Sequence, residues 1–252
     1  MMKALRCGFG WMSLALVFAL VSCNGAATTV PSTQGSGSMT VSPLGFAPGT
    51  ITPMSPIITS PGKIDGIDNQ FAPVDGDTSS GGNGPTIGKV PCLPTMGNGY
   101  HVHVFLGIVY KGQLMAVPDA LGMLNPGPES SGYINTAQCF YEIHTHDASG
   151  IVHIEVAQPH PLNSVVFRLK NALAVWGIPH SNTSFGPFKG KIHVYTGMPA
   201  ALGQTTVSSY SPFTGKHWTL MGLRSHEVIW IEIGRPYYNA AQLPPVTFYM
   251  EY

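Results

Sequence analysis

The sequence predicts an α+β fold that is mainly antiparallel β-sheet with one main helix. Glycine (30) and proline (22) are abundant among the 252 residues, whereas only 10% are charged, a composition that favours a turn-rich β protein. Several short segments alternate between apolar and polar residues as half-buried strands do, and one segment has helical apolar spacing. Lys+Arg and Asp+Glu both number 12, so no basic field attracts nucleic acid and we expect no such partner.

Residues 1–22 have the features of a signal peptide. Lys3 and Arg6 give a positive start, and Trp11 to Val21 form an apolar run. That run is shorter than a typical membrane-spanning helix, but its length suits a secretory signal.

The signal ends in Leu20-Val21-Ser22-Cys23, which resembles the lipobox of bacterial lipoproteins. This resemblance implies that Cys23 is lipid-modified and attaches the mature protein to a membrane. Asn24 follows instead of Asp, which favours outer-membrane attachment in a Gram-negative cell envelope, on the periplasmic or surface face. The alternative is an ordinary signal peptide cut near Ala26-Ala27.

The rest of the chain divides into three parts by composition. Residues 23–61 are rich in Ser, Thr, Pro and Gly without a regular apolar period, which indicates a flexible tether. Residues 62–91 form a transitional, loop-rich segment. Residues 92–252 are the predicted folded domain, which is rich in histidine.

The folded part begins with a predicted hairpin. Its first strand runs from Tyr100 to Val109, the turn is Tyr110-Lys111-Gly112-Gln113, and the partner strand Leu114–Val117 stops before Pro118. A Pro/Gly/Ser-rich loop from Leu124 to Thr136 follows.

A second hairpin is predicted from Phe140 to Val156. Its strands are Phe140–His146 and Ile151–Val156, joined by Asp147-Ala148-Ser149-Gly150, with Gly150 at positive φ. If this turn closes, His144 lies across from His153 and Glu142 across from Glu155.

One helix and three strands complete the prediction. Helical spacing of Val166, Leu169, Leu173 and Trp176 predicts a helix at Ser164–Val175, which Asn163 or Ser164 could cap and Gly177 ends. The predicted strands are Lys191–Tyr195, Trp218–Leu220 and Glu227–Ile233. A hairpin, a helix and two strands give ββαββ order after an extra hairpin, and Leu223–Val228 resembles the corresponding segment of β-grasp domains.

Cys92 and Cys139 remain in the predicted folded domain. Two cysteines in an oxidising compartment most often pair, so we expect a disulfide worth roughly 4 kcal/mol by loop entropy. A thiolate metal ligand is the alternative.

Five histidines on the predicted strands avoid the apolar face. His101 and His103 alternate with Tyr100, Val102 and Val104, and the same alternation separates His144, His146 and His153 from apolar neighbours. Imidazole is the commonest protein ligand for zinc and copper. We therefore predict a copper or zinc site at His101, His103, His144, His146 and His153, with Asp147 and Glu155 in supporting positions.

Other functions compete with metal binding. The histidines could instead form a structural hydrogen-bond network in a cell-envelope scaffold that has a protein partner. An amidohydrolase would need a barrel of alternating strands and helices. His146, Asp147 and Ser149 lie within four residues of a tight turn, where the geometry of a catalytic triad is not expected. We predict no catalytic residue, and a non-catalytic role is favoured.

From about Gly62 to its end, the chain is similar to a group of secreted or membrane-anchored bacterial proteins. The shared features are His101-x-His103, Val117-Pro118-x-x-Leu121-Gly122, Cys139-x-Tyr141-x-x-His144-Thr145-His146-Asp147, Ser149-Gly150-x-x-His153-x-Glu155, Val175-Trp176-Gly177, Leu223-x-x-His226-Glu227 and Pro244-Pro245. The resemblance implies architecture and compartment but no activity. This chain departs from the group in its long loop Leu124–Thr136 and in a helix without the usual glycine-aromatic core.

Overall fold

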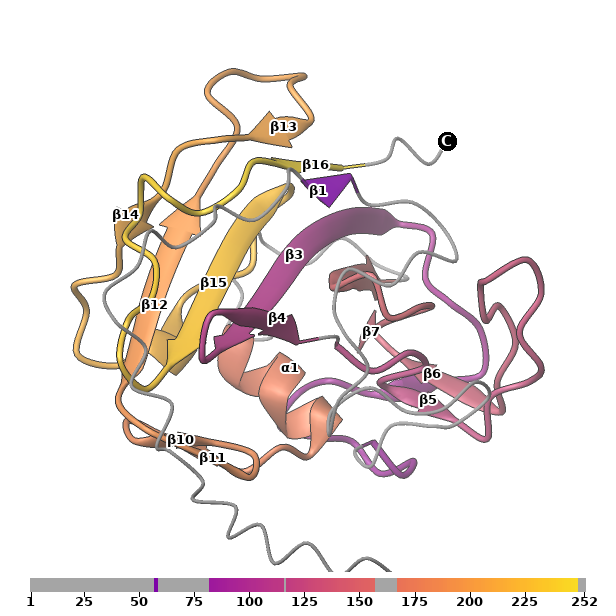
Figure 1. The fold of residues 1–252 in the computed structure, drawn as a ribbon. Coiled ribbons are helices and arrows are strands. Elements are labelled where there is room, and N and C mark those ends of the chain that lie inside the picture. The colour runs from indigo at the N-terminus through magenta and orange to yellow at the C-terminus, as the bar shows by residue number, and fades with distance from the viewer. Residues whose placement is uncertain (1–56, 59–81, 116, 157–166, 249–252) are drawn as a thin grey trace, which may run out of the picture. The chain divides into compact units, whose positions relative to one another are not determined.

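A computed structural model describes residues 57–58, 82–115, 117–156 and 167–248 (Figure 1). The predicted signal peptide, Cys23, most of the tether, the predicted helix start at Ser164 and His160 lie outside the described residues. Within them, no helix is long and apolar enough to cross a membrane.

A seven-stranded mixed sheet forms the centre of the fold (Figure 1). Its order is β14 (Ser211–Pro212), β12 (Ile192–Gly197), β15 (Glu227–Ile233), β3 (Tyr100–Tyr110), β8 (Ile151–Val156) and β7 (Ile143–His144), and β4 (Gln113–Met115) also pairs with β3. β15 and β3 are parallel, and the other pairs in this sheet are antiparallel.

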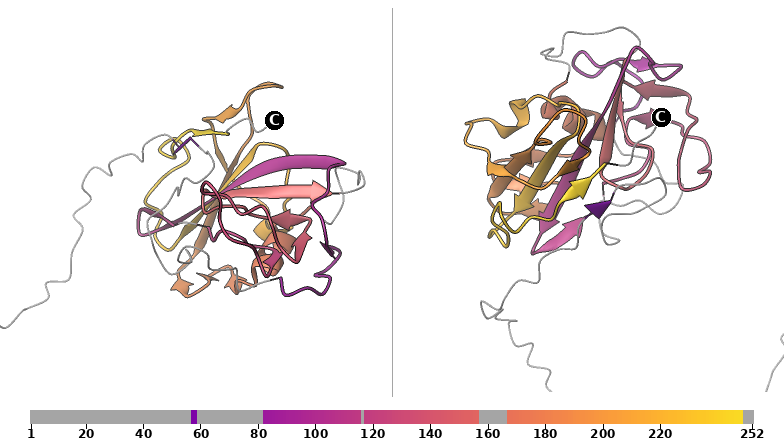
Figure 2. Two further views of the ribbon diagram at one scale, coloured as in Figure 1. Left: turned by 90° about the vertical axis from the view of Figure 1, so that its right-hand side faces the viewer. Right: turned by 90° about the horizontal axis from the view of Figure 1, so that it is seen from above.

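Three small sheets surround the large one. They are β1 (Ile57–Ile58), β16 (Val246–Thr247) and β13 (Thr206–Val207); β11 (Phe188–Lys189), β10 (Ser184–Phe185) and β9 (His180–Ser181); and β2 (Cys92–Leu93), β6 (Cys139–Tyr141) and β5 (Met123–Leu124). Figure 2 shows β1 beside β16 in both views, so a strand near the end of the predicted tether joins the C-terminal part of the fold. The predicted disulfide Cys92–Cys139 is confirmed and joins β2 to β6.

Both faces of the large sheet are covered by apolar cores, and the side chains of each strand alternate between them. Val104, Leu106 and Ile108 of β3 belong to the core that packs against helix α1 (Leu169–Trp176). Phe105 and Val109 point the other way, into a second core with Trp230. His101 and His103 share this second face, so the histidines and α1 lie on opposite sides of the sheet.

Several sequence predictions are confirmed. The first hairpin forms, with Tyr110 opposite Gln113 and Lys111 and Gly112 both at positive φ. Gly150 has φ of 91°, and Gly177 ends the helix in the left-handed region with φ of 75°. β15 has the predicted bounds, and β12 covers most of the predicted strand.

The predicted strand Phe140–His146 is broken at Glu142. Tyr141 pairs with Cys92 of β2, whereas Ile143 pairs with Ile154 of β8, so the chain passes from one sheet to another. Pairing with two differently placed strands requires a bend that alternation alone cannot reveal.

Two further predictions are wrong in detail. Residues Trp218–Leu220 form a 3₁₀ turn, η1, in which the carbonyl of His217 accepts the N–H of Leu220. The helix begins at Leu169, because Arg168 is extended and forms a β-bridge with Gly222. The bridge partner of Arg168 lies about fifty positions away, and it outweighs the local helical preference.

Candidate metal centre

The strand register brings the predicted histidines together at one end of the sheet. On the face opposite α1, His153 of β8 lies between His103 of β3 and His144 of β7. Glu155, two residues after His153, lies opposite His101. The predicted pairing of His144 with His153 is confirmed, and the spacing of two residues keeps all these side chains on one face.

Three of these residues form an inner triad, His144, His146 and Glu155. Their exposed fractions are 0%, 2% and 7%. The Nε2 atoms of His144 and His146 are 3.1 Å apart, and they lie 3.8 and 3.7 Å from Oε1 of Glu155. The three ligand atoms are thus close enough to hold one metal ion.

Backbone carbonyls fix the proton positions of both inner histidines. Nδ1 of His144 donates to the carbonyl of Tyr141 at 2.7 Å, and Nδ1 of His146 donates to that of Ile134 at 2.6 Å. A carbonyl can only accept, so each Nδ1 carries a proton. In the neutral rings each Nε2 is then a bare acceptor, as a metal ligand must be.

Burial keeps His144 neutral. It lowers the pKa of His144 to about 4, and the neighbouring His146 lowers this pKa further, while Glu155 opposes the shift. The bare Nε2 of His144 therefore faces another imidazole nitrogen and a carboxylate oxygen in a space without water access. Facing acceptors repel one another unless a cation lies between them.

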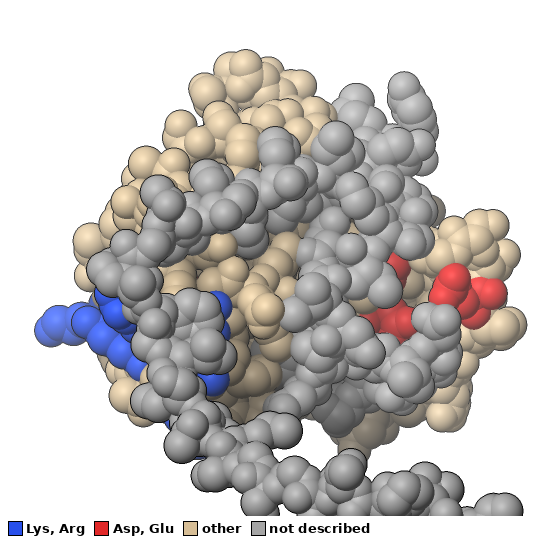
Figure 3. Space-filling view, in the orientation of Figure 1, with Lys and Arg blue, Asp and Glu red and all other residues tan. Residues whose placement is uncertain are grey.

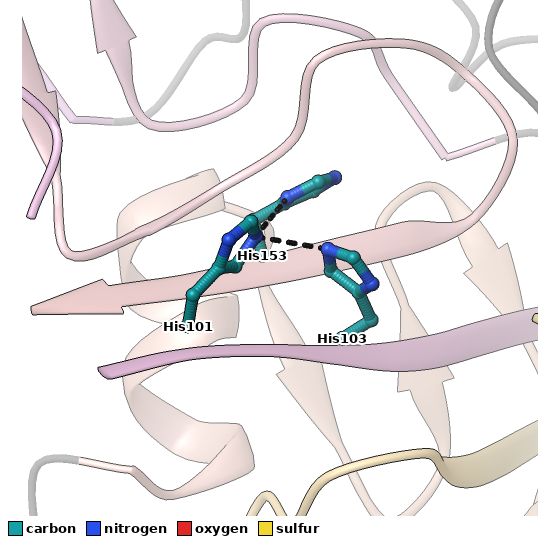
Figure 4. A group of neighbouring side chains, drawn as sticks. All are labelled: His101, His103 and His153. Carbon is teal, nitrogen blue, oxygen red and sulfur yellow. Dashed lines mark hydrogen bonds between the residues drawn. The ribbon is translucent and has the colours of Figure 1, made fainter. Parts of the chain in front are cut away.

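The other three histidines form an outer triad, His101, His103 and His153 (Figure 4). Nε2 of His101 lies 2.9 Å from Nε2 of His103 and 3.2 Å from Nδ1 of His153. The side chain of His101 is 43% exposed, whereas His153 is buried. The outer triad therefore connects the buried cluster with solvent.

Glu155 lies between the two triads. Its Oε1 is 3.2 Å from Nε2 of His101 and 3.5 Å from Nδ1 of His153, besides its contacts with His144 and His146. Burial raises the pKa of the Glu155 carboxyl, but interactions with His146, His153 and the other imidazoles outweigh burial and hold this pKa well below its usual range. The cluster thus has one ionised carboxylate.

Tyr133 belongs to the site, although the sequence did not predict it. Its ring stacks on His146 with 4.3 Å between centroids, and its hydroxyl lies 3.3 Å from Nε2 of His153. Ile134, whose carbonyl accepts from His146, is in the same loop. Nothing in this Pro/Gly/Ser-rich stretch distinguishes a tyrosine that covers a site from one on a surface.

The predicted supporting residue Asp147 lies in the turn after β7. Its Oδ1 accepts the backbone N–H of Ser149, which shapes the turn. The bonds to Nδ1 of His144 and of His146 come from the carbonyls of Tyr141 and Ile134. Sequence patterns cannot reveal such backbone partners, because every residue offers a carbonyl.

The remaining described histidines lie outside the two triads. His180 and His217 are exposed, and His193 is partly exposed. His226 precedes β15 at φ of 57°, and its N–H donates to the carbonyl of His103 at 2.7 Å. It therefore supports the backbone of β3 beside the outer triad.

Charged side chains are separated across the visible face. Lys and Arg gather on the left of Figure 3, toward β12, and Asp and Glu lie on the right, toward β5 and β6. Strand β7 lies on the same side of this view as the acidic residues.

Comparisons with known proteins add no functional information: no family model, curated protein or solved structure matches the chain. The donor atoms thus provide the functional argument. Imidazole nitrogens with one carboxylate suit zinc or copper better than magnesium or calcium, which prefer oxygen ligands.

Proposed function

We propose that this protein is a lipid-anchored protein of the bacterial cell envelope that binds a transition metal, copper or zinc, through its histidine cluster. The inner triad supports the proposal most strongly. His144, His146 and Glu155 point three acceptor atoms at one another in a buried space. A metal ion between them converts repulsion into coordination.

The separations within the inner triad suit ligands of one ion. Two nitrogens bound at about 2.0–2.1 Å from zinc lie roughly 3–3.4 Å apart, depending on the bond angle. The measured Nε2–Nε2 distance is 3.1 Å. Glu155 needs to move by less than an ångström to complete such a set, on the order of a small side-chain adjustment.

A structural network is the competing function. Its support is the pair of hydrogen bonds from His144 and His146 to backbone carbonyls, which would fix the strands even without a metal. In this case extra protons, rather than a metal ion, separate the facing acceptors. The domain would then serve as an envelope scaffold with a protein partner.

Metal analysis of the purified mature protein distinguishes the two functions. Dialysis against Zn²⁺ or Cu²⁺ followed by elemental analysis is expected to show at least one tightly bound ion per chain. The His144→Ala/His146→Ala variant should lose it, whereas His217→Ala, at an exposed histidine, should not. A wild-type protein without bound metal, destabilised by His144→Ala equally with and without chelator, would favour the network.

Membrane attachment is a separate part of the proposal, supported by the sequence Leu20-Val21-Ser22-Cys23. In a Gram-negative host the full chain is expected in the outer-membrane fraction and to incorporate labelled fatty acid. Cys23→Ala should abolish labelling and release the protein from membranes. Equal membrane association of both proteins would exclude Cys23 as the anchor.

We also propose a β-grasp relationship for the central strands. Its support is the order β8-β3-β15-β12, with β3 and β15 parallel in the middle and α1 after β8. The extra strands β4 to β7 then form an insertion between β3 and β8. This insertion contains His144, His146 and Tyr133.

A further inference from the structure

We propose that the outer triad is a second metal position, that it shares Glu155 with the inner one, and that the protein therefore holds two ions, the outer one exchangeable. This inference rests on the proposed metal-binding function and extends it. The occupant is a divalent transition-metal ion.

The number of donors is the first argument. Six ligand atoms, five imidazole nitrogens and a carboxylate oxygen, fall into two groups of three. A zinc site usually takes four ligands, of which a catalytic or exchange site supplies three from protein. One ion held by the inner triad would leave the three outer ligand atoms without an ion, whereas two ions use all six.

The geometry of the outer triad is the second argument. The distances from His101 Nε2 to His103 Nε2 (2.9 Å) and to His153 Nδ1 (3.2 Å) lie close to the roughly 3–3.4 Å expected for nitrogens on one ion. The ligand atoms of His101, His103 and His153 thus face one another within the outer triad.

Tyr133 fixes which nitrogen of His153 faces the outer position. Its hydroxyl lies 3.3 Å from Nε2 of His153, so Nδ1 is the ring nitrogen on the side of the cluster. That atom lies toward His101 and Glu155. Tyr133 thus resembles the partners that fix the orientation of metal-binding imidazoles in other proteins.

Glu155 provides the bridge. Its Oε1 contacts nitrogens of both triads at 3.2 to 3.8 Å. A carboxylate has two oxygens and about four lone-pair sites, so it can bind two ions at once. Ions about 3.5–4 Å apart are typical of two-metal centres.

The two positions differ in access to solvent. The inner histidines are at most 2% exposed, whereas the side chain of His101 is 43% exposed. The outer ion is therefore open to water or to an incoming ligand, and the inner ion is enclosed. We expect ions to enter and leave by the outer position.

The number of ions bound per chain of the mature protein tests the second metal position. After metal removal, titration with Zn²⁺ alone is expected to saturate at two ions per chain, and a chelator should release one rapidly and one slowly. His101→Ala/His103→Ala should retain a single, slowly released ion. If the wild type saturates at one ion and His144→Ala/His146→Ala loses that ion, the second position is wrong and the proposed function stands. If the wild type binds no ion, both are wrong.

Copper tests the shared carboxylate directly. Two Cu²⁺ ions bridged by Glu155 are expected to couple magnetically, so the electron paramagnetic resonance signal of the fully loaded protein should be well below that of two isolated ions. Glu155→Gln should restore signal per bound ion. This spectroscopic measurement needs only folded wild-type protein if the histidine variants fail to fold. Two uncoupled ions would overturn the bridge.

Discussion

At the residue scale, the chemistry of the cluster depends on which nitrogen of each ring carries the proton. Carbonyls of Tyr141 and Ile134 accept hydrogen bonds from the Nδ1–H groups of His144 and His146, which leaves Nε2 as the metal-binding nitrogen of each ring. The hydroxyl of Tyr133 lies beside Nε2 of His153 and is the partner of that ring nitrogen. Three partners outside the predicted ligand set therefore determine whether the imidazoles can bind a metal.

Tyr133 offers a test of this positioning role. Tyr133→Ala removes both the stacking on His146 and the hydroxyl beside His153, and partners of this kind typically change metal affinity about 10–100-fold. We expect such a loss for Tyr133→Ala in competition titrations with a zinc chelator. Tyr133→Phe, the matched control, keeps the stacking and should lose less. Equal affinities for all three proteins would show that Tyr133 merely covers the site.

Glu232 makes stability depend on pH far from the cluster. Its side chain is buried, Oε2 has no hydrogen-bond partner, and Oε1 accepts the N–H groups of Tyr237 and Tyr238. Burial raises the pKa of Glu232 above its ordinary 4.5, and the two N–H groups oppose this only in part. The folded protein therefore keeps this proton to a higher pH than the unfolded chain does.

The sign of the effect follows from proton binding. Between the two pKa values the unfolded chain binds fewer protons, so the contribution of Glu232 to stability is complete below pH 4.5 and is lost as pH rises through the raised value. Glu232→Gln keeps an acceptor but cannot ionise. Urea unfolding of both proteins at several pH values should show the wild type losing stability relative to the variant above pH 4.5. A pH-independent difference would contradict this.

At the element scale, local patterns predicted the faces but not the neighbours. Alternation correctly placed His101, His103 and His153 on one side of their strands, and turn chemistry gave the register of His144 with His153. The parallel pairing of β3 with β15 joins residues more than a hundred positions apart, and no local preference encodes it. For the same reason, the contribution of Tyr133 could not be predicted.

The disulfide stabilises the element that leads into the site. Cys92 and Cys139 join β2 to β6, and Cys139 lies four positions before Ile143, where β7 begins. Loop entropy for a separation of 47 residues predicts a loss of roughly 4 kcal/mol on removal. The Cys92→Ser/Cys139→Ser variant should therefore unfold at lower urea concentration, and reduction should affect the wild type but not the variant. A reduced wild-type protein that is as stable as the oxidised one would argue against this role.

At the scale of the whole molecule, the site joins parts of the chain that are distant in sequence. Its ligands come from β3, from β7 and the turn after it, and from β8, while the loop with Tyr133 covers them. Two apolar cores lie on the faces of the large sheet and do not depend on these ligands. The fold therefore does not require the proposed metal ion, although such an ion would stabilise it.

We therefore expect the metal-free protein to be folded but less stable, unlike small zinc domains that unfold without metal. A ligand that binds only the folded state at 100 times its dissociation constant adds about 2.7 kcal/mol, which raises the Tm of a domain of this size by roughly 5–10 °C. Thermal melts with Zn²⁺ and with chelator measure the shift. His217→Ala should retain it and His144→Ala/His146→Ala should lose it. An identical Tm with zinc and chelator in the wild type would contradict the coupling, because an ion held by β3, β7 and β8 must stabilise the sheet that positions them.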